Sequence, residues 1–198
     1  MDLPTLLTDR RMTRSFTGDP VDLDALARSC ALALRAPTAG NCGGVRMTIV
    51  GSESIADYVE RATDAEWRAA SRRVAGLARA GALVVVTSRP ADYAARYAEP
   101  DKAASGLADP TAWPVPYWHG DAGMATMALL LLVQDAGLGT ALWGNFRHDA
   151  RVLEWLGAPE ESLFATVFVG HPDRLDPPSS SLRRAVPAPA ERVRRRGA

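Results

Sequence analysis

The chain has 198 residues, of which 47% are hydrophobic and 23% are charged. These values are typical of a globular protein and exclude a disordered, collagen-like or coiled-coil chain. The 23 Lys and Arg residues balance the 23 Asp and Glu residues, so the overall charge gives no support for binding nucleic acid or an anionic membrane.

Cysteine content and the apolar runs indicate where the protein works. Cys30 and Cys42 are too few for a disulfide scaffold and have no metal-ligand spacing. We therefore expect a reduced, cytoplasmic protein without a metal. The first residues do not read as a signal peptide. The longest apolar run, residues 124–133, is shorter than the ~20 residues that a membrane-spanning helix needs, so we expect no membrane partner.

The first elements are a helix, a loop and a strand. Asp22 has the character of an N-cap, and apolar residues recur at helical spacing over 23–34. Residues 36–44 are rich in Pro, Thr, Gly and Asn, which predicts a loop. The alternation that follows predicts a short strand over 47–50.

Two further helices are predicted before the next strand. One begins near Ser54. The other begins at Thr63, because Thr63 and Glu66 have the spacing of a capping box. Its predicted apolar stripe consists of Trp67, Ala70, Val74 and Leu77.

The middle of the chain combines a buried strand, an irregular segment and a long helix. The continuous apolar run at 82–86 predicts a strand buried on both faces. Residues 90–118 are punctuated by Pro and Gly and lack strong periodicity, which is typical of a lid or mobile segment. Residues 121–135 predict a helix that is apolar nearly all round and ends at Gly137, so it must lie in the core or at a subunit interface.

The last elements complete a sheet. A short strand or an extended turn is predicted over 138–143, a helix over 149–156 closed by Gly157, and a strand over 163–169. Few, short strands among many helices favour a sheet with helices on both faces. We expect one domain over residues 1–186 and a basic, flexible tail over 187–198.

Two clusters near the N-terminus suggest ligand binding. Arg10, Arg11 and Arg14 place three guanidinium groups in five residues, which favours an anion site, although a solvated helix end explains them equally simply. The loop at 36–44 offers free backbone N–H groups that can surround the polar edge of a ligand. The alternative interpretation is a simple helix-to-strand connection, whose turns need the φ angles that glycine adopts.

Two clusters in the second half have the same ambiguity. Gly139 and Gly144 lie in residues 136–146, where they permit close approach of the backbone to a flat ligand. This segment is neither a dinucleotide fingerprint nor a Walker A loop. Arg183 and Arg184 form a basic pair near the C-terminus that is either an anion contact or a solvated surface.

Together these clusters resemble the FMN-dependent nitroreductase family over roughly residues 8–186. Residues 10–16, Arg-Arg-Met-Thr-Arg-Ser-Phe, are similar to that family's Arg-Arg-Ser-x-Arg-x-Phe. Residues 36–41, Ala-Pro-Thr-Ala-Gly-Asn, resemble its Ala-Pro-Ser-x-x-Asn. The apolar helix leading into Gly137-Leu138-Gly139-Thr140 and the strand ending at 170–172, Gly-His-Pro, resemble its second half.

The resemblance implies a fold, a partner and a cofactor. The fold is α+β, a three-layer α/β/α sandwich with a mostly antiparallel sheet, and its long apolar helix lies at a homodimer interface. Two FMN sites lie at that interface, and NAD(P)H is the electron donor. The cofactor performs the chemistry, so we expect no catalytic side chain.

The resemblance also implies which residues bind FMN. Arg10, Arg11 and Arg14 would hold its phosphate, ribityl chain and pyrimidine edge, with Arg183 and Arg184 completing the phosphate contact. Backbone N–H groups at Trp143 and Gly144 would face the flavin N5 atom, and residues around Thr38 would come from the other subunit. The full expected set is Arg10, Arg11, Met12, Arg14, Pro37, Thr38, Ala39, Asn41, Leu142, Trp143, Gly144, Arg183 and Arg184.

The sequence departs from the family at two places. Met12 replaces the family's Ser, which removes a hydroxyl contact. Residues 41–45, Asn-Cys-Gly-Gly-Val, replace Asn-x-Gln-Pro-Trp, so we expect a looser loop, with either a larger pocket or weaker FMN binding as the result. Candidates for the substrate pocket, with core packing as the alternative for the aromatic residues, are Cys42, Trp113, Tyr117 and Trp118.

These observations predict a flavin-dependent oxidoreductase. It would transfer hydride from NAD(P)H through FMN to an electron-poor small molecule such as a nitroaromatic or a quinone, in a ping-pong cycle. One alternative is a protein that binds or sequesters FMN without catalysis. Another is a specialised flavin-dependent dehydrogenase on the same fold. Arg192 to Arg196 in the tail permit phosphate contacts, but terminal charge runs are usually solvated, so no nucleic-acid partner is expected.

Overall fold

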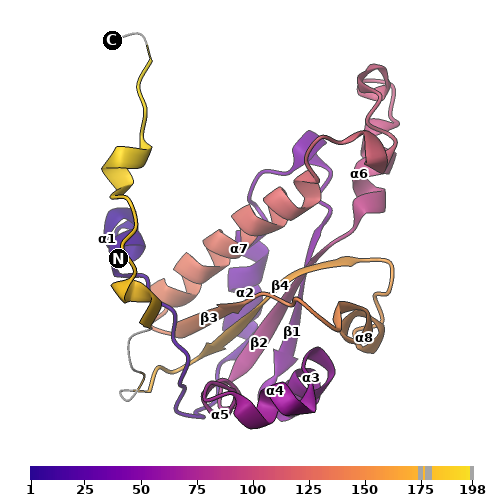
Figure 1. Ribbon diagram of the computed structural model, residues 1–198. Helices are drawn as coiled ribbons and strands as arrows, with labels where there is room; N and C mark the ends of the chain where they lie inside the picture. Colours follow the sequence, from indigo (N-terminus) through magenta and orange to yellow (C-terminus); the bar gives the residue numbers. More distant parts are fainter. Residues whose placement is uncertain (174–175, 177–179, 197–198) are drawn as a thin grey trace.

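In the described part of the chain, four strands form one antiparallel sheet between two layers of helices (Figure 1). The computed structural model describes residues 1–173, 176 and 180–196. The strands are β1 (Val45–Gly51), β2 (Ala82–Ser88), β3 (Gly139–Trp143) and β4 (Ser162–Gly170). The helices are α1 (Leu3–Asp9), α2 (Leu23–Ala33), α3 (Ile55–Ala62), α4 (Ala65–Ala70), α5 (Val74–Leu77), α6 (Pro90–Tyr97), α7 (Tyr117–Asp135) and α8 (Asp149–Trp155).

The sheet has the order β1-β2-β4-β3, and every neighbouring pair is antiparallel. Every residue of β2 is buried, as its continuous apolar sequence predicts for a strand covered on both faces. Val84 of β2 lies opposite Ile49 of β1 and Val167 of β4. The strands predicted at 47–50, 82–86, 138–143 and 163–169 are all confirmed.

Helices cover both faces of the sheet. On one face, Val84 and Val86 pack in a core with Leu26 of α2 and Leu129 of α7. On the other face, Leu83 and Val85 pack with α3, α5 and α8. The predicted three-layer α/β/α arrangement is therefore confirmed, and alternate residues of β2 supply both cores.

Two predicted helix ends are confirmed in atomic detail. Asp22 caps α2, because its Oδ1 accepts hydrogen bonds from the backbone N–H groups of Asp24 and Ala25. Gly137 follows α7 with a positive φ of 79°, and Leu138 N–H donates to the Val133 carbonyl at 3.1 Å. This is a common way to end a helix at glycine.

The helix predicted from Thr63 is wrong in two respects. Thr63 does not cap it, since its hydroxyl donates to the Val59 carbonyl in the preceding helix. The predicted stripe is divided between α4 and α5, because the chain is extended at Ser71. Gly76 of α5 lies so close to the Arg14 carbonyl that a Cβ would fall 2.3 Å from its oxygen. The packing of α5 against residues 14 and 15 therefore accompanies the interruption between α4 and α5.

The segment at 90–118 contains more structure than its sequence indicates. Residues 90–97 form α6, which begins with Pro90 at a position where the missing N–H costs nothing. Tyr93 of α6 is fully buried. Helix α7 begins at Tyr117, immediately after Pro116 and four residues before the predicted start at Asp121.

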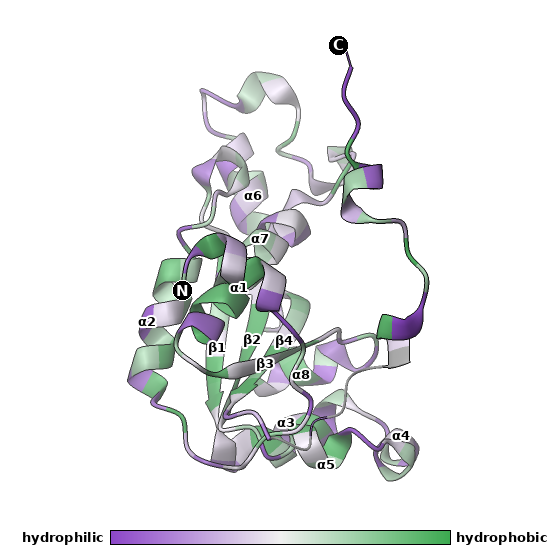
Figure 2. Ribbon diagram, turned by 90° about the vertical axis from the view of Figure 1, so that its left-hand side faces the viewer, coloured by the Kyte–Doolittle hydropathy of each residue, from purple (hydrophilic) through white to green (hydrophobic). Residues whose placement is uncertain are grey.

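The C-terminal segment runs away from the body of the molecule in both views (Figures 1 and 2). All of the residues from 181 to 196 are exposed. Among the described residues, no helix is long and apolar enough to cross a membrane.

Candidate functional site

Residues 12–16 form an extended segment beside the edge strand β3. Met12 forms a parallel bridge with Thr140, and the Thr13 N–H donates to the Thr140 carbonyl at 2.7 Å. A Cβ on Gly139 would fall 2.5 Å from the Thr13 hydroxyl oxygen, so this close approach requires glycine. The Leu142 N–H also points to the Met12 Sδ at 3.3 Å. The structure thus brings the first predicted cluster to the strand that leads into Trp143 and Gly144.

The three arginines of this segment lie in different environments. Arg10 is partly buried, and its Nη1 atom is buried without a hydrogen-bond acceptor among the described residues. Arg11 is exposed. Arg14 is partly buried, and its backbone N–H donates to the buried Asp176 at 3.0 Å. A buried guanidinium nitrogen that lacks an acceptor is costly, and an anionic ligand would satisfy it.

Asn145 fixes the turn that follows β3. Its amide donates to the Tyr58 hydroxyl at 2.9 Å, and its Oδ1 accepts from the Thr166 hydroxyl at 3.0 Å. The Tyr58 and Thr166 hydroxyls also share a hydrogen bond, so three side chains from α3, β4 and the turn form a closed network. Burial raises the pKa of Tyr58, which keeps this hydroxyl protonated. Sequence reasoning missed Asn145, whose one signal is its place directly after Gly144.

Trp143 anchors the same turn through its ring. The ring stacks on Trp67 of α4 with a centroid distance of 5.7 Å and an interplanar angle of 13°. It also meets the rings of Tyr58 and Phe168 at 6.3 and 5.6 Å. The backbone at Trp143 and Gly144 is therefore held on both sides, by the ring contacts and by the Asn145 network.

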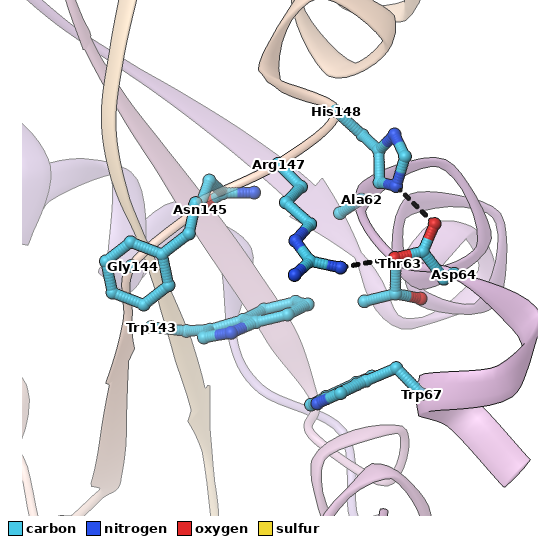
Figure 3. A pocket seen from close by; sticks show the side chains of 10 residues that line it. Ala62, Thr63, Asp64, Trp67, Trp143, Gly144, Asn145, Arg147 and His148 are labelled. Atoms are coloured by element: carbon cyan, nitrogen blue, oxygen red, sulfur yellow. Dashed lines mark hydrogen bonds and ion pairs between the residues drawn. The ribbon is translucent and has the colours of Figure 1, made fainter. Parts of the chain in front are cut away.

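A cavity of about 380 Å³ lies between this turn and the junction of α3 and α4 (Figure 3). Asp64 lies at its edge. Its carboxylate forms a hydrogen bond of 2.7 Å with His148 and an ion pair of 3.3 Å with Arg147. These two contacts, with His148 the larger, lower the pKa of Asp64. The lining residues are Ala62, Thr63, Asp64, Trp67, Trp143, Gly144, Asn145, Phe146, Arg147 and His148.

The loop at 36–44 is anchored to helices α6 and α7. The Ala39 N–H and the Tyr93 hydroxyl both donate to Oδ2 of the buried Asp121, at 2.8 and 2.9 Å. Arg96 donates to the Gly40 carbonyl at 2.8 Å. Gly44 lies beneath the Tyr93 ring, where a Cβ would fall 2.4 Å from a ring carbon. The expectation of a loose loop is therefore wrong, since the glycine that replaces a larger residue makes room for Tyr93.

This loop and the arginine segment lie at opposite ends of α7 (Figure 1). Ala39 contacts Asp121 in the first turns of the helix, whereas Gln134 near its other end contacts the Leu6 carbonyl, just before the arginines. At 1.5 Å per residue, Asp121 and Gln134 are about 20 Å apart. Within one chain, the predicted residues Pro37, Thr38, Ala39 and Asn41 are therefore not brought to the others.

The substrate-pocket candidates lie near that loop. Trp113 is buried, and its indole N–H donates to the Leu107 carbonyl at 2.8 Å. Its ring meets those of Tyr93, Tyr97 and Trp118, so core packing describes Trp113 in this chain. Trp118 and Cys42 are partly exposed, and Tyr117 is 48% exposed.

Arg183 and Arg184 lie in the C-terminal segment, at the end of a short 3₁₀ helix. Both are exposed, and neither forms an ion pair with another described residue. The structure does not bring them into contact with Arg10 or Arg14 in the described part of the chain.

Comparison with known sequences identifies the family. The sequence model of the nitroreductase family matches residues 7–171. The match covers most of the chain, and the chain belongs to this family. No curated protein sequence matches it.

Solved structures share the fold at low sequence identity. A nitroreductase family protein from Streptococcus pneumoniae TIGR4 is 19% identical with a TM-score of 0.74, covering 98% of this chain and 100% of that one. Nitroreductase CinD from Lactococcus lactis, in complex with nicotinic acid, is 17% identical with a TM-score of 0.73, covering 94% and 100%. A protein from Desulfovibrio desulfuricans in complex with FMN is 18% identical with a TM-score of 0.70, covering 100% and 99%. The chain therefore has the nitroreductase-like fold.

Proposed function

We propose that this protein is an FMN-dependent oxidoreductase that acts as a homodimer. The observation that carries the proposal is the buried, unsatisfied Nη1 of Arg10 in a segment that pairs with β3. Membership of the nitroreductase family supports the same cofactor, as does the FMN complex of the Desulfovibrio desulfuricans protein.

The residues present fit a flavin mononucleotide. Arg10, Arg11 and Arg14 supply the guanidinium groups that a phosphate and a pyrimidine edge require. Met12 and Leu142 lie beside each other and would line the cofactor, and the fixed backbone of Trp143 and Gly144 would face its reactive edge. The exposed residues Arg183 and Arg184 are available to complete the phosphate contact.

FMN, when bound, would supply hydride transfer from NAD(P)H to an electron-poor acceptor such as a nitroaromatic or a quinone, in a ping-pong cycle. The chain would bind and orient the cofactor and place positive charge near the position where the reduced ring carries negative charge. No side chain needs to act as a nucleophile or as a general acid or base.

The separation of the two groups of site residues supports a homodimer. The loop at 37–41 and the segment at 10–14 lie at opposite ends of α7, so one chain cannot present both to one ligand. A second copy, packed antiparallel along α7, would join them. Exposed apolar side chains on α1, α2 and α7 favour such an interface, and Figure 2 shows apolar residues on α1 and α2 in green. The exposed apolar side chains on these three helices include Leu3, Leu7, Leu23, Leu32 and Met124.

Flavin titration of the purified protein tests the proposal. We expect flavin absorbance bands that shift on binding, NAD(P)H oxidation that depends on an added acceptor, and a dimer in analytical ultracentrifugation. Replacing Arg10 or Arg14 with Ala should weaken FMN binding roughly tenfold or more, because charge-assisted hydrogen bonds are lost. Arg151→Ala, on α8, is the matched control.

The same titration separates the alternatives. Bound FMN without NAD(P)H oxidation would favour a protein that sequesters the cofactor. A protein that neither contains flavin nor binds added FMN would refute the oxidoreductase proposal, whatever its fold.

A further inference from the structure

The loop at 36–44 has a backbone that its own hydrogen bonds do not fully hold. Gly40, Asn41 and Gly43 have positive φ angles of 65°, 54° and 62°, a region that glycine and, less readily, Asn adopt. Inside the loop, the Asn41 N–H donates to the Thr38 carbonyl at 2.8 Å, and the Gly43 N–H donates to the Thr38 hydroxyl at 3.1 Å. A backbone in this region keeps one shape only where contacts from outside the loop hold it.

Arg96 of α6 supplies such a contact at the centre of the loop. Its Nε donates to the Gly40 carbonyl at 2.8 Å, and a Cβ on Gly40 would fall 3.2 Å from the Arg96 Cγ. The rest of the guanidinium is held by carboxylates, with two hydrogen bonds of 2.7 Å to Asp101 and one of 3.0 Å to Glu99. The side chain is only 22% exposed. One planar group therefore ties the loop to the segment that follows α6, and the single ammonium of lysine could not reproduce this geometry.

The residue next to this contact offers a free polar group. Asn41 is exposed, and its side-chain amide forms no hydrogen bond with another described residue. Figure 1 shows α6 and the segment after it projecting beyond the end of the sheet. In the proposed homodimer, the loop would bring this amide to the flavin site of the second copy. The direction of the amide depends on the backbone at Gly40, which Arg96 holds.

We propose that Arg96 is a positioning residue for the flavin site of the second copy. It would hold the Gly40 carbonyl, and so direct Asn41 toward the cofactor, without touching the cofactor itself. Asp101 and Glu99 would share this role, because they fix the guanidinium. The inference rests on the proposed function, since it requires the loop at 37–41 to reach FMN across a dimer.

Two measurements on Arg96→Met test the proposal. Methionine keeps the length of the side chain but removes the guanidinium. In the protein without FMN, amide hydrogen exchange of peptides spanning 36–44 should become faster, while that of β2 should not change. With FMN, the dissociation constant should rise about tenfold, because a charge-assisted hydrogen bond no longer fixes the loop. Faster exchange with unchanged FMN affinity would show a role in local stability alone and would overturn the proposal.

Two further variants separate position from charge. Arg96→Lys retains the charge but not the planar group, so its FMN affinity should fall nearly as far as that of Arg96→Met. Full affinity in Arg96→Lys would assign the effect to charge and refute the positioning role. Arg61→Met is the matched control, because Arg61 also donates to a backbone carbonyl, that of Asp57 at 3.4 Å, but lies on α3 away from the loop. It should leave both the FMN affinity and the exchange of the loop unchanged.

A mixed dimer shows in which site Arg96 acts. One chain would carry Arg10→Ala and the other Arg96→Met. If the loop acts across the dimer, both changes fall in one flavin site and the other site is intact. The mixed dimer should then bind one FMN with normal affinity. Two weakened sites would mean that Arg96 acts within its own chain, which contradicts the proposal.

The same measurements distinguish this proposal from the proposed function. Exchange of the loop is read without FMN, so it reports the hold of Arg96 whether or not the cofactor binds. Faster exchange in Arg96→Met, together with no FMN binding by the unaltered protein, would refute the oxidoreductase while supporting the hold of Arg96 on the loop. FMN binding and NAD(P)H oxidation that are equal in Arg96→Met and in the unaltered protein would support the oxidoreductase and refute the role of Arg96.

Discussion

The hydroxyl of Tyr93 donates a hydrogen bond of 2.9 Å to Oδ2 of Asp121, a carboxylate that is only 2% exposed. The same oxygen accepts the Ala39 N–H at 2.8 Å. One carboxylate oxygen therefore connects α6, α7 and the loop at 36–44. That loop is the part of the chain that we propose to reach the flavin site of a second copy, and its shape is set within its own chain.

Tyr93→Phe should destabilise the protein. The variant keeps the ring over Gly44 but removes one of the two donors to the buried carboxylate of Asp121. We expect the free energy of unfolding in urea to fall by about 1–2 kcal/mol. Tyr97→Phe is the matched control, because the Tyr97 hydroxyl has no hydrogen bond to another described residue. An equal decrease in the free energy of unfolding in the two variants would mean that the hydrogen bond between Tyr93 and Asp121 does not stabilise the fold.

Gly44→Ala should also destabilise the protein, but through crowding. The added Cβ would fall 2.4 Å from the Tyr93 ring, which is fully buried and cannot move aside. Overpacking of this kind costs about 1–3 kcal/mol. Gly120→Ala in α7 is the control, since a Cβ there has no neighbour within 4 Å and alanine favours helices. Thermal denaturation of both variants measures the difference in stability. A Gly44→Ala protein that is as stable as the Gly120→Ala control would contradict the prediction.

Elements set by local sequence could be predicted, while those set by distant contacts could not. The apolar run of β2, the Asp22 cap and the Gly137 helix end each depend on a few adjacent residues, and all three are confirmed. The break between α4 and α5 does not follow from local spacing. It accompanies the approach of Gly76 to the Arg14 carbonyl, more than 60 residues earlier in the chain. Periodicity shows which face of a segment is apolar but not where that segment must bend.

The candidate site was predictable as a list of segments but not as an arrangement. Residues 10–14 and 142–144 were expected to share a site, and the contact between Met12 and Leu142 brings them side by side. The Asn145 network joins residues 58, 145 and 166, whose partnership has no signature in sequence spacing. Tyr93, which fills the space above Gly44, fell in a segment with no clear periodicity. These contacts depend on the folded sheet, so only the structure reveals them.

The buried tyrosines should make the protein sensitive to alkali. Burial raises the pKa of Tyr58 and, with the hydrogen bond to Asp121, that of Tyr93 above the ordinary value of about 10. The phenolate is therefore favoured in the unfolded chain. The stability that these two hydroxyls contribute is complete below about pH 10 and declines as the pH rises further.

Absorbance at 295 nm, which reports phenolate, checks this expectation. Tyr58 and Tyr93, which are both fully buried, should titrate only as the protein unfolds. Circular dichroism recorded across the same pH range separates the two steps. If the phenols of Tyr58 and Tyr93 titrate near pH 10 with the fold intact, the burial of these two side chains does not hold in solution.

The two cysteines should differ in reactivity. Cys30 lies in the core between α2 and the sheet, and burial raises its pKa to about 11. Cys42 is partly exposed in the anchored loop. Because the thiolate is the reactive form and burial also blocks access to the sulfur, Cys30 should react with a thiol reagent at pH 8 far more slowly than Cys42. Titration with a chromogenic disulfide should show one fast thiol per folded chain and two after denaturation, and Cys42→Ser should abolish the fast phase. Two fast thiols in the folded protein would mean that α2 opens readily from the sheet.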